Sequence, residues 1–572
     1  MKCSYCSNPV NKKGPYYGWK SGKASHVKCY ESNPRTWSPE QKVVIEDVKS
    51  GKGNTVVQAR AGTGKTSTIV ESLKTLPPNK SILLAAFNVK IKNDLLEKQK
   101  QGEIRPDVWI KTLNAVGNMC IKNQYGNRAN LVDDAISQSI DLIWGRKTLD
   151  DKLWGSFGAL RRLLDIAKGT LAHHRSDLEM LCDKYQIVPG KNIELKEFID
   201  IADRLLHETA VAINHSNCCD SSRPSVFRNV SVRPYDFADQ VWLTITQNLP
   251  VPQFDYVFID ETQDLNLAQI ELVLKMCGEN GRIVAIGDDR QAIYRFRGSD
   301  EFAVDRVIKE LKAKVLPLTV SFRCSKAVIK EAQQYVPDIQ PWEHAKEGKV
   351  ERVNRAKFLT IIQPMNPPSF VLSRTNAPLA GICLDLIRKR KPARIAGRKD
   401  ILPVLLNLIN KSKAHTVVDL IEWLEEYKYA ERTRLSKRKN VEKIIEQMED
   451  EVDTVLEFTQ GMGPLISKSG GNEIDALKRE IEGVFIDEEK EKPRENYILC
   501  STVHKAKGLE SAQVGMLLET FKPGGDIEEK NITYVAITRS QDELYYVTET
   551  NPRYRTNWER VMTELEWEVN GW

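Results

Sequence analysis

Ala59–Thr66, with the sequence ARAGTGKT, is the segment whose residue types and spacing indicate chemistry most directly. It follows an apolar run that predicts a strand and opens a segment that predicts a helix, which is the context that a phosphate-binding loop requires. Gly62 and Gly64 would let the backbone bend so that successive N–H groups face phosphates at the helix N-terminus. Lys65 would reach the β- and γ-phosphates, and the Thr66 hydroxyl would ligate Mg²⁺. A chance glycine turn is the alternative, and the flanking strand and helix argue against it.

A second segment, 258–264 (FIDETQD), places two carboxylates directly after another apolar run. Asp260 at the predicted strand end suits a magnesium ligand, and Glu261 could orient and deprotonate the water that attacks the γ-phosphate. The alternative is an acidic helix start, since carboxylates favour helix N-termini. That alternative would be preferred for this segment in isolation. Because a phosphate loop lies upstream in the same chain, the nucleotide interpretation is favoured.

The elements that would position these residues are short apolar runs alternating with amphipathic segments. This pattern predicts an α/β fold with parallel sheets covered by helices. Two helical stretches, about 118–235 and about 400–495, interrupt it and look like insertions into two α/β cores. The predicted strands are Thr55–Ala59, Ser81–Phe87, Tyr256–Ile259, Ile283–Ile286, Leu316–Val320, Phe370–Leu372, Tyr497–Cys500, Val514–Leu518 and Leu544–Thr548.

Length and composition are those of a multidomain globular protein. A chain of 572 residues predicts about three to five domains. Hydrophobic residues make up 41% and charged residues 28%, which excludes a disordered composition. The net charge of +6 permits a local basic groove without demonstrating one. No apolar run is long enough for a signal peptide or a membrane span, so we expect an intracellular, cytoplasmic protein without a membrane partner.

The first 35 residues contain paired metal-ligand spacings, Cys3-x₂-Cys6 and His26-x₂-Cys29. Three thiolates and one imidazole match the tetrahedral set that Zn²⁺ prefers in structural sites. The intervening residues look loop-like and cannot build a core, so bound metal would supply the organising energy. The alternative is a tail with unrelated cysteines. We predict a structural zinc module that presents lysines to nucleic acid or to a protein partner.

Four further segments resemble, in order, motifs III to VI of superfamily 1 DNA helicases of the UvrD/Rep type. They are 287–298 (GDDRQAIYRFRG), 320–325 (VSFRCS), 502–510 (TVHKAKGLE) and 534–539 (YVAITR). The segments AGTGKTST and LAAFN are also similar in sequence to the F-box DNA helicases of that family. The resemblance implies two RecA-like P-loop domains that bind ATP in the cleft between them. It covers both predicted cores, from Gln41 to about Leu544.

The resemblance also implies the residues of the ATP site. Gln41 would hydrogen-bond adenine and Phe322 would stack on it, while Gln291 would sense the γ-phosphate. Arg323 and Arg539 would reach that phosphate from the second core, a role that suits the planar, permanently charged guanidinium. The remaining expected contacts are Glu510 on the sugar and the loop residues Ala59, Gly62, Thr63, Gly64, Lys65, Thr66 and Ser67. The chain departs from the family's pattern at Ala59, usually glycine, and at Ser67, often arginine.

A further set of residues is implied to contact single-stranded DNA. Stacking of bases on aromatic rings contributes about 1–3 kcal/mol per base and tolerates any sequence, as a translocating motor requires. Core packing is the alternative for the aromatic members. Residues 112–114 (TLN) depart from the family's usual Thr-Phe-His. The implied DNA contacts are Phe87, Asn88, Thr112, Tyr294, Phe296 and His504.

Together these observations predict an ATP-dependent helicase that moves along single-stranded DNA and acts at single-strand/duplex junctions, with 3′-to-5′ polarity implied by the resemblance. The alternative is a translocase that mainly strips bound proteins or recombinase filaments. We expect the protein to be nucleoid-associated if it comes from a bacterium or a phage, and nuclear if it is eukaryotic. The expected domains are a zinc module (1–35), the first core (36–117 and 236–303) with a helical insertion (118–235), and the second core (304–399 and 496–572) with a helical insertion (400–495).

Overall fold

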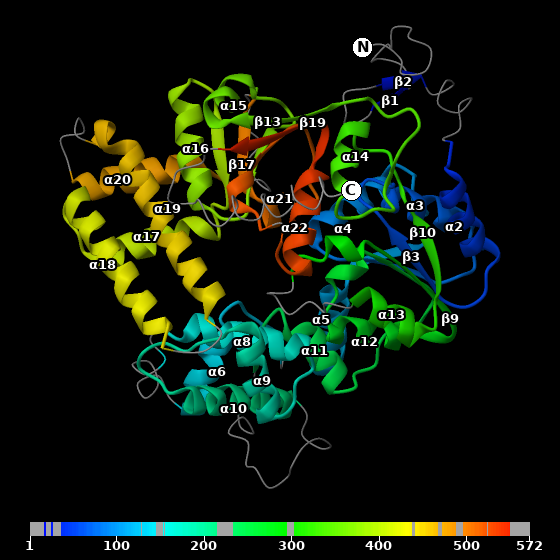
Figure 1. Ribbon diagram of the computed structural model, residues 1–572. Coiled ribbons are helices and arrows are strands. Elements are labelled where there is room, and N and C mark those ends of the chain that lie inside the picture. The colour runs from blue at the N-terminus through cyan, green and yellow to red at the C-terminus, as the bar shows by residue number, and fades with distance from the viewer. Residues whose placement is uncertain are drawn as a thin grey trace.

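Two separate parallel sheets organise the chain in a computed structural model (Figure 1). The central strands of each sheet are buried on both faces by helices, which explains why they are nearly continuous apolar runs. The mixed α/β class and two core sheets agree with the sequence prediction. The structure describes residues 16–18, 24–26, 36–126, 129–144, 153, 155–213, 233–294, 303–437, 441–466, 472–487, 496–522 and 524–548.

The first sheet brings the predicted phosphate-binding and acidic segments to one edge. Its strand order is β10-β3-β9-β8-β4-β5, and every neighbouring pair is parallel. In such a sheet the carboxyl ends of the strands lie together and form the usual ligand-binding crevice. The strands are β3 (Thr55–Ala59), β4 (Ile82–Ala86), β5 (Val108–Thr112), β8 (Phe254–Asp260), β9 (Cys277–Gly287) and β10 (Lys314–Leu318).

Helices cover both faces of this sheet. Val44, Ile69 and Leu73 pack on one face, whereas Val116 and Val273 belong to the apolar cluster on the other. The helices of this core are α2 (Pro39–Ser50), α3 (Lys65–Thr75), α4 (Val89–Lys100), α5 (Leu113–Tyr125), α11 (Asp239–Thr246), α12 (Leu267–Met276) and α13 (Ala303–Leu311).

The second sheet has the order β13-β19-β18-β14-β17-β15-β16 and is likewise parallel throughout. Its strands are β13 (Lys349–Asn354), β14 (Ser369–Ser373), β15 (Ala393–Ala396), β16 (Phe485–Ile486), β17 (Ile498–Thr502), β18 (Ser511–Leu517) and β19 (Ser540–Thr548). The short pair β11 (Val320–Ser321) and β12 (Gln340–Pro341) precedes it. The helices are α14 (Lys326–Ala332), α15 (Arg355–Ile361), α16 (Ala377–Arg388), α21 (Val503–Ala506) and α22 (Ile527–Ile537).

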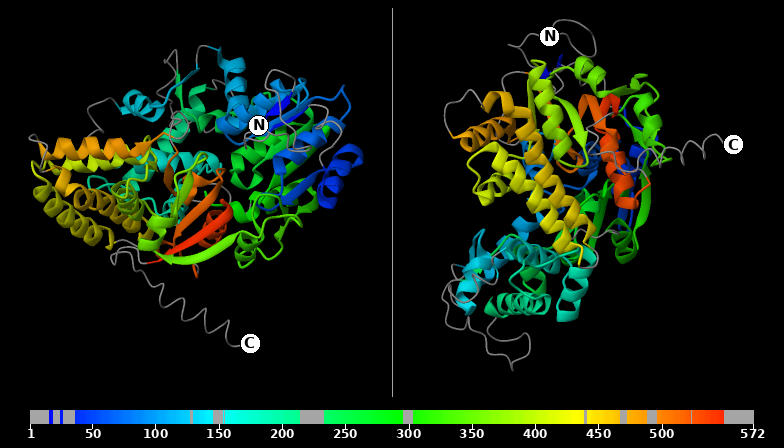
Figure 2. Two further views of the ribbon diagram at one scale, coloured as in Figure 1. Left: turned by 90° about the horizontal axis from the view of Figure 1, so that it is seen from above. Right: turned by 60° about the vertical axis from the view of Figure 1, so that its left-hand side comes forward.

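The two predicted insertions are helical, and they contact one another (Figure 2). Lys191 in the first forms an ion pair with Glu431 in the second at 3.0 Å, and the Lys443 N–H donates to Gln186 Oε1 at 3.1 Å. The first contains α6 (Ala135–Trp144), α8 (Phe157–Gly169), α9 (Arg175–Tyr185), α10 (Leu195–Ile213) and the parallel strands β6 (Ala129–Leu131) and β7 (Arg233–Tyr235). The second contains α17 (Ile401–Ser412), α18 (Val417–Leu435), α19 (Glu442–Ile466) and α20 (Glu473–Val484).

The division between the units differs from the sequence prediction at two places. We expected the second core to start at residue 304, but β10 pairs with β3, and Leu316 and Leu318 are buried in the first core. The first core therefore extends to Leu318. The second insertion returns to its core earlier than residue 495, because β16 already pairs with β15. Apolar runs predict strands, but they do not reveal which sheet each strand joins.

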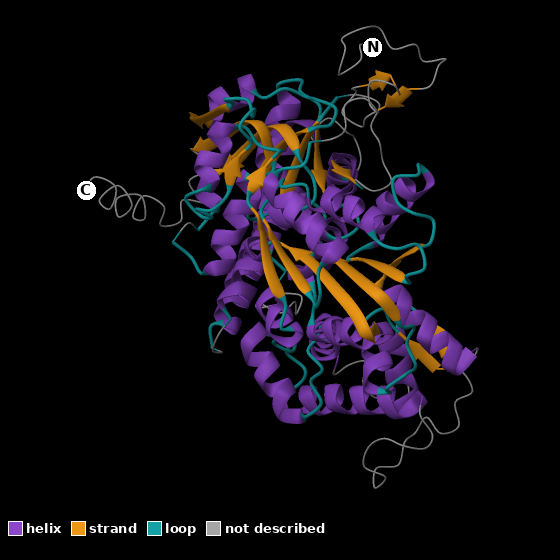
Figure 3. Cartoon of the chain, turned by 90° about the vertical axis from the view of Figure 1, so that its right-hand side faces the viewer, coloured by secondary structure: helices purple, strands orange, loops and turns teal. Residues whose placement is uncertain are grey.

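The N-terminal segment forms a short hairpin where the sequence predicted only loop (Figure 3). Strands β1 (Tyr16–Gly18) and β2 (Ala24–His26) pair antiparallel, with Tyr16 opposite His26. The predicted zinc ligands Cys3, Cys6 and Cys29, and the His26 side chain, lie outside the described residues. Among the described helices, none is both long and apolar enough to cross a membrane.

Candidate active site

The phosphate-binding loop has the predicted form of strand, glycine turn and helix. Gly62 and Gly64 have φ values of +74° and +81°, which a residue with a side chain rarely adopts. A Cβ at Gly62 would also lie 2.6 Å from the Arg323 Cβ and from the Ser321 Oγ of the second core. Glycine at this position thus permits both the turn and the close approach of the two cores.

Lys65, the first residue of α3, and Glu261, after β8, form an ion pair at 3.0 Å. Burial opposes charge on both groups, yet the pKa of Lys65 is raised by Glu261. The pKa of Glu261 is held at about 2 because Lys65 and then Lys507 outweigh its burial. Glu261 also has a φ of +57°, a costly backbone conformation that is typical of functional positions. Both predicted catalytic groups are therefore charged and in contact.

The Thr66 hydroxyl donates to Asp260 Oδ2 at 3.2 Å. A hydroxyl and a carboxylate are hard oxygen ligands, so this pair fits the magnesium role predicted for it. Burial, followed by repulsion from Glu261, raises the pKa of Asp260 to about 6. A divalent cation at this position would favour the ionised form of the carboxyl group.

Gln263 connects Glu261 to the end of the neighbouring strand β9. Its amide Nε2 donates to Glu261 Oε2 at 2.6 Å, and its Oε1 accepts from the Asp288 N–H at 3.0 Å. A Cβ at Gly287 would lie 2.6 Å from that Oε1, so the contact requires glycine there. Gln291, predicted to sense the γ-phosphate, donates instead to Asp288 Oδ2 at 2.8 Å. The sequence analysis overlooked Gln263 and Asp288, because polar residues at strand ends carry no signal of their pairing.

The second core contributes the two predicted arginines. Arg323 forms an ion pair with Glu510 at 2.6 Å. Arg539 is 1% exposed and donates to the carbonyls of Val535 and Leu509, at 3.0 and 3.1 Å. Burial and then the charge of Arg323 lower the pKa of Arg539 to about 10. The structure thus brings both arginines and Glu510 together, with their polar groups engaged by the second core itself.

Gln41 lies beneath the phosphate loop rather than at an open surface. Its Oε1 accepts from the Ser38 N–H at 3.0 Å, completing a capping box at the start of α2. Its Nε2 donates to the Thr63 carbonyl and to the Thr68 hydroxyl, both at 3.2 Å. The side chain is 3% exposed, so in this conformation it supports the loop. Phe322, by contrast, is 39% exposed.

Several polar contacts join the two cores around this site, and three of them are made by Arg60, Tyr534 and Lys507. Arg60 of the phosphate loop pairs with Asp289 at 2.6 Å and Asp288 at 3.2 Å, and extends to Asp338 of the second core at 2.8 Å. In the second contact, Tyr534 of α22 accepts from the Ala61 N–H at 3.0 Å and donates to Asp288 Oδ2 at 3.3 Å.

The third contact is a buried ion pair between Lys507 and Asp264. Lys507 Nζ lies 2.7 Å from both Asp264 oxygens and 2.8 Å from the Gln291 carbonyl. Its charge also lies 4.7 Å from the centre of the Tyr294 ring. Burial raises the pKa of Asp264 to about 6, although Lys507 opposes that rise.

The predicted DNA residues fall into two groups. Tyr294 donates its hydroxyl to the His504 carbonyl at 3.1 Å, and the two rings lie 6.3 Å apart. Asn88 and Thr112 begin α4 and α5, where their side chains accept from the N–H groups of Ile91 and Ala115. Phe87 is half-buried at the end of β4. Phe296 lies outside the described residues.

Phe237 was not predicted as a DNA contact. The structure shows it 66% exposed, close to the residues that begin α5. Its carbonyl accepts from the Asn114 side chain at 2.8 Å. The signal available in the sequence was an aromatic between two aspartates, Asp236 and Asp239, in an otherwise polar turn.

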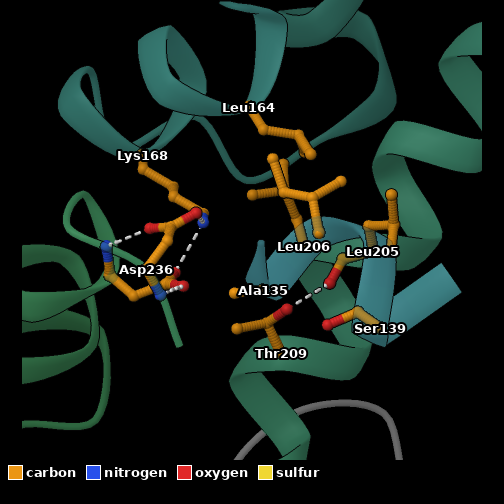
Figure 4. Close-up of a pocket in the computed structure, with 10 residues that line it drawn as sticks. Ala135, Ser139, Leu164, Lys168, Leu205, Leu206, Thr209 and Asp236 are labelled. Atoms are coloured by element: carbon orange, nitrogen blue, oxygen red, sulfur yellow. Dashed lines mark hydrogen bonds and ion pairs between the residues drawn. The ribbon is translucent and has the colours of Figure 1, made fainter. Parts of the chain in front are cut away.

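A small cavity nearby is lined by a buried cluster of charged side chains (Figure 4). Lys168 is 2.8 Å from Asp236 and 2.7 Å from Asp239. Burial raises the pKa of Asp239 to about 7, and the free volume is about 10 Å³. That space holds about one water molecule, so the cavity is too small for a nucleotide or a base.

Comparison with known families gives matches along most of the chain. The UvrD/REP helicase N-terminal domain matches residues 37–312, and the UvrD-like helicase C-terminal domain matches residues 244–551. Together the two matches include every described residue of both sheets.

Individual relatives are distant. The ATP-dependent DNA helicase PcrA of Bacillus subtilis is 24% identical over 51% of this chain and 38% of its own length. DNA helicase II of Haemophilus influenzae is 23% identical over 51% of the chain and 39% of its own length. The F-box DNA helicase protein 1 of Schizosaccharomyces pombe is 24% identical over 90% of the chain and 58% of its own length. The chain therefore matches less than two thirds of the length of each of these curated relatives.

The buried pair Lys507–Asp264 predicts a specific pattern of stability. Lys507→Met leaves the Asp264 carboxylate buried without its partner, and should destabilise the protein by about 3–5 kcal/mol. Adding Asp264→Asn removes the orphaned charge, so the double variant should be more stable than the sum of the single losses predicts. Urea unfolding of the four proteins measures this.

Lys505→Met is the matched control, because its 2.7 Å pair with Asp400 is exposed. It should cost no more than about 1 kcal/mol. The assigned ion pair would be contradicted if the losses in unfolding free energy of Lys507→Met and Asp264→Asn were strictly additive. It would also be contradicted if Lys505→Met lost as much as Lys507→Met.

Proposed function

Because the chain belongs to the UvrD/Rep family of helicases, we propose that it is an ATP-driven motor that moves along single-stranded DNA and separates strands. The observation that carries the proposal is the position of the Lys65–Glu261 pair at the junction of the two cores. Polar contacts of Arg60, Tyr534 and Lys507 are among those that cross that junction. Binding or release of phosphate at this site would therefore act directly on the contacts that fix the position of one core against the other.

Hydrolysis would begin with an exchange of partners at Lys65. The phosphates of ATP attract the Lys65 ammonium away from Glu261, which leaves the carboxylate to accept a proton from the attacking water. Losing the lysine raises the pKa of Glu261 from about 2 and so strengthens it as a base. Gln263 keeps hold of the same carboxylate through its 2.6 Å hydrogen bond. Mg²⁺ held by Thr66 and Asp260 would neutralise charge on the phosphates.

A series of contacts that starts at Glu261 could transmit the effect of phosphate release to the proposed DNA-binding residues. Gln263 joins Glu261 to Asp288, and Asp288 also holds Gln291 and Tyr534. Lys507 in turn joins the Gln291 carbonyl to Tyr294. The contacts that position the base thus extend, through the charge of Lys507 over the Tyr294 ring, to a residue predicted to contact DNA.

Substitutions at Lys65 and Glu261 separate binding from hydrolysis. Lys65→Ala should abolish tight nucleotide binding, because it removes the cation that holds the phosphates. Glu261→Gln should preserve binding and lower DNA-stimulated ATP hydrolysis by about 10²–10⁴-fold, the usual contribution of a general base. Nucleotide binding and single-turnover hydrolysis measure the two effects.

Lys74→Ala is the control, since Lys74 lies on the same helix α3 in an exposed pair with Glu71. It should behave like the unaltered chain. Near-normal hydrolysis by Glu261→Gln would show that another group is the base.

The DNA path we propose crosses the same edge of the first sheet. Phe87 and Asn88 follow β4 there and Thr112 ends β5, with Phe237 exposed beside them. Tyr294 and His504 lie where the second core meets the first. Aromatic rings along one edge suit sequence-independent stacking of bases.

Polarity and strand separation are tested with duplexes that carry a single-stranded tail. We expect unwinding of a 3′-tailed duplex and little unwinding of a 5′-tailed one, and binding to single strands should weaken steeply with salt through counterion release. Efficient unwinding from the 5′ tail would overturn the proposed direction. Weak unwinding together with rapid displacement of a bound protein would favour the alternative, a translocase that strips protein filaments.

We also propose that Cys3, Cys6, His26 and Cys29 bind one structural Zn²⁺. The paired ligand spacing supports this, and the β1–β2 hairpin follows the first ligand pair and ends at His26, the first ligand of the second pair. Elemental analysis should find about one zinc per chain. Replacing Cys3 and Cys6 with serine should release it, while ATP hydrolysis on plain single strands persists. A chain without zinc would remove the module, and loss of the whole fold would mean that the module packs into the motor.

A further inference from the structure

Arg60, in the phosphate-binding loop, has a buried guanidinium that binds carboxylates of both cores. The residue is 8% exposed. Its Nη1 lies 2.6 Å from Asp289 Oδ1 and 3.2 Å from Asp288 Oδ1, which both belong to the first core. Its Nε and Nη2 face Asp338 of the second core, at 2.9 Å from Oδ1 and 2.8 Å from Oδ2. One side of the guanidinium therefore serves each core.

The backbone of Arg60 is fixed within the first core. Its N–H donates to the Leu318 carbonyl at the end of β10 at 2.8 Å, and its carbonyl accepts from the Thr63 hydroxyl at 2.9 Å. Burial opposes the charge of the side chain, yet the neighbouring carboxylates, Asp338 first among them, raise the pKa of Arg60. The backbone bonds and Nη1 together give the guanidinium a place in the first core that does not depend on the second core.

Asp338 lies in the short connection between α14 and β12, which is anchored in the second core. The next residue, Ile339, is fully buried, and its carbonyl accepts from Gln333 Nε2 at 2.8 Å. The Asp338 side chain is 50% exposed, whereas that of Asp288 is completely buried. Water can therefore replace Arg60 on Asp338, but it cannot do so on Asp288 without a large penalty for the buried charge.

The two sides of the guanidinium thus differ in how easily their contacts break. A bidentate pair needs both nitrogens aligned with both oxygens, so a small rotation of one core against the other disrupts it. The contacts of Nη1 lie within one core and are not affected by such a rotation.

We propose that Arg60 is a positioning residue that clasps the two cores together over the bound nucleotide. Nη1 keeps the guanidinium on the first core throughout the cycle. The pair with Asp338, the Arg60–Asp338 clasp, forms when the cores close and breaks when they separate. This rests on the proposed function, because it assigns Arg60 to the closing and reopening of the cores in that motor.

The Arg60–Asp338 clasp should slow the release of product. ADP leaves when the cores separate, and separation requires that both bonds to Asp338 break. The bonds are lost to water rather than to another protein group, so the clasp delays reopening without preventing it. The dissociation rate of ADP is therefore the quantity that the clasp controls.

Asp338→Asn tests the clasp in the full chain bound to single-stranded DNA, because it removes the carboxylate charge and leaves Arg60 on the first core. A fluorescent ADP analogue should dissociate about three- to tenfold faster, the effect of one half-exposed bidentate pair. Salt screens such a pair, so the difference between the two proteins should narrow at high salt. Asp338→Glu keeps the charge and should restore slower dissociation. Stopped-flow fluorescence measures all of these rates.

Arg60→Lys tests whether Asp338 acts through Arg60. Lysine keeps a positive charge beside Asp288 and Asp289, but it cannot form the two parallel bonds to Asp338. Adding Asp338→Asn to Arg60→Lys should therefore accelerate ADP dissociation less than Asp338→Asn does in the unaltered chain. A purely structural role of Asp338 in the second core would give the same acceleration in both backgrounds.

Glu347→Gln is the matched control, because its exposed 2.6 Å pair with Lys326 lies wholly within the second core. It should leave ADP dissociation unchanged. Unchanged dissociation in Asp338→Asn, or equal acceleration in the Arg60→Lys chain, would overturn the clasp. Failure of the proposed function is distinguishable, because a chain that releases ADP faster after Asp338→Asn but does not move along DNA would keep the clasp and lose the motor.

Discussion

The ion pair between Lys65 and Glu261 is the interaction on which the rest of the site depends. Without nucleotide, a partly buried ammonium and a partly buried carboxylate each need an opposite charge, and each supplies it to the other. The phosphates of a nucleotide compete for the same ammonium. Binding therefore does two things at once, since it satisfies Lys65 and releases Glu261. In the proposed mechanism, Glu261, whose pKa is low without nucleotide, becomes a base only when its substrate is present.

The contacts beyond Glu261 explain why this exchange would not remain local. Gln263 and Asp288 are buried and bind one another, so movement of the Glu261 carboxylate alters hydrogen bonds that have no water to replace them. Tyr534 and Arg60 join the same aspartate to the second core. Buried polar contacts of this kind favour discrete arrangements over gradual deformation, which suits the alternation between two core positions that the proposed motor requires.

Much of this site could be predicted from the sequence, because its motifs are local. The phosphate loop, the Asp260–Glu261 pair and the strand β3 depend on residues that are neighbours in the chain. Arg60–Asp338 and Lys507–Asp264 were not predicted, since their partners are 278 and 243 residues apart and neither belongs to a recognisable spacing. The assignment of β10 failed for the same reason. Its apolar pattern marks a strand, but only the pairing with β3 shows that it closes the first sheet.

The residues predicted to bind the nucleotide already have hydrogen-bond or ion-pair partners within the protein, and this affects how much affinity each can contribute. Gln41, Arg323 and Arg539 all use their polar groups within the protein: on the phosphate loop, on Glu510 and on backbone carbonyls. Each such bond must be exchanged for one to the nucleotide, so these residues contribute only the difference between the two partners. For Arg323 that difference is favourable, because a phosphate carries more charge than the half-exposed Glu510. For Gln41 an amide would exchange one neutral acceptor for another, with little net gain. Affinity should therefore be concentrated in the phosphates, leaving the base to be held by contacts that displace no internal hydrogen bond.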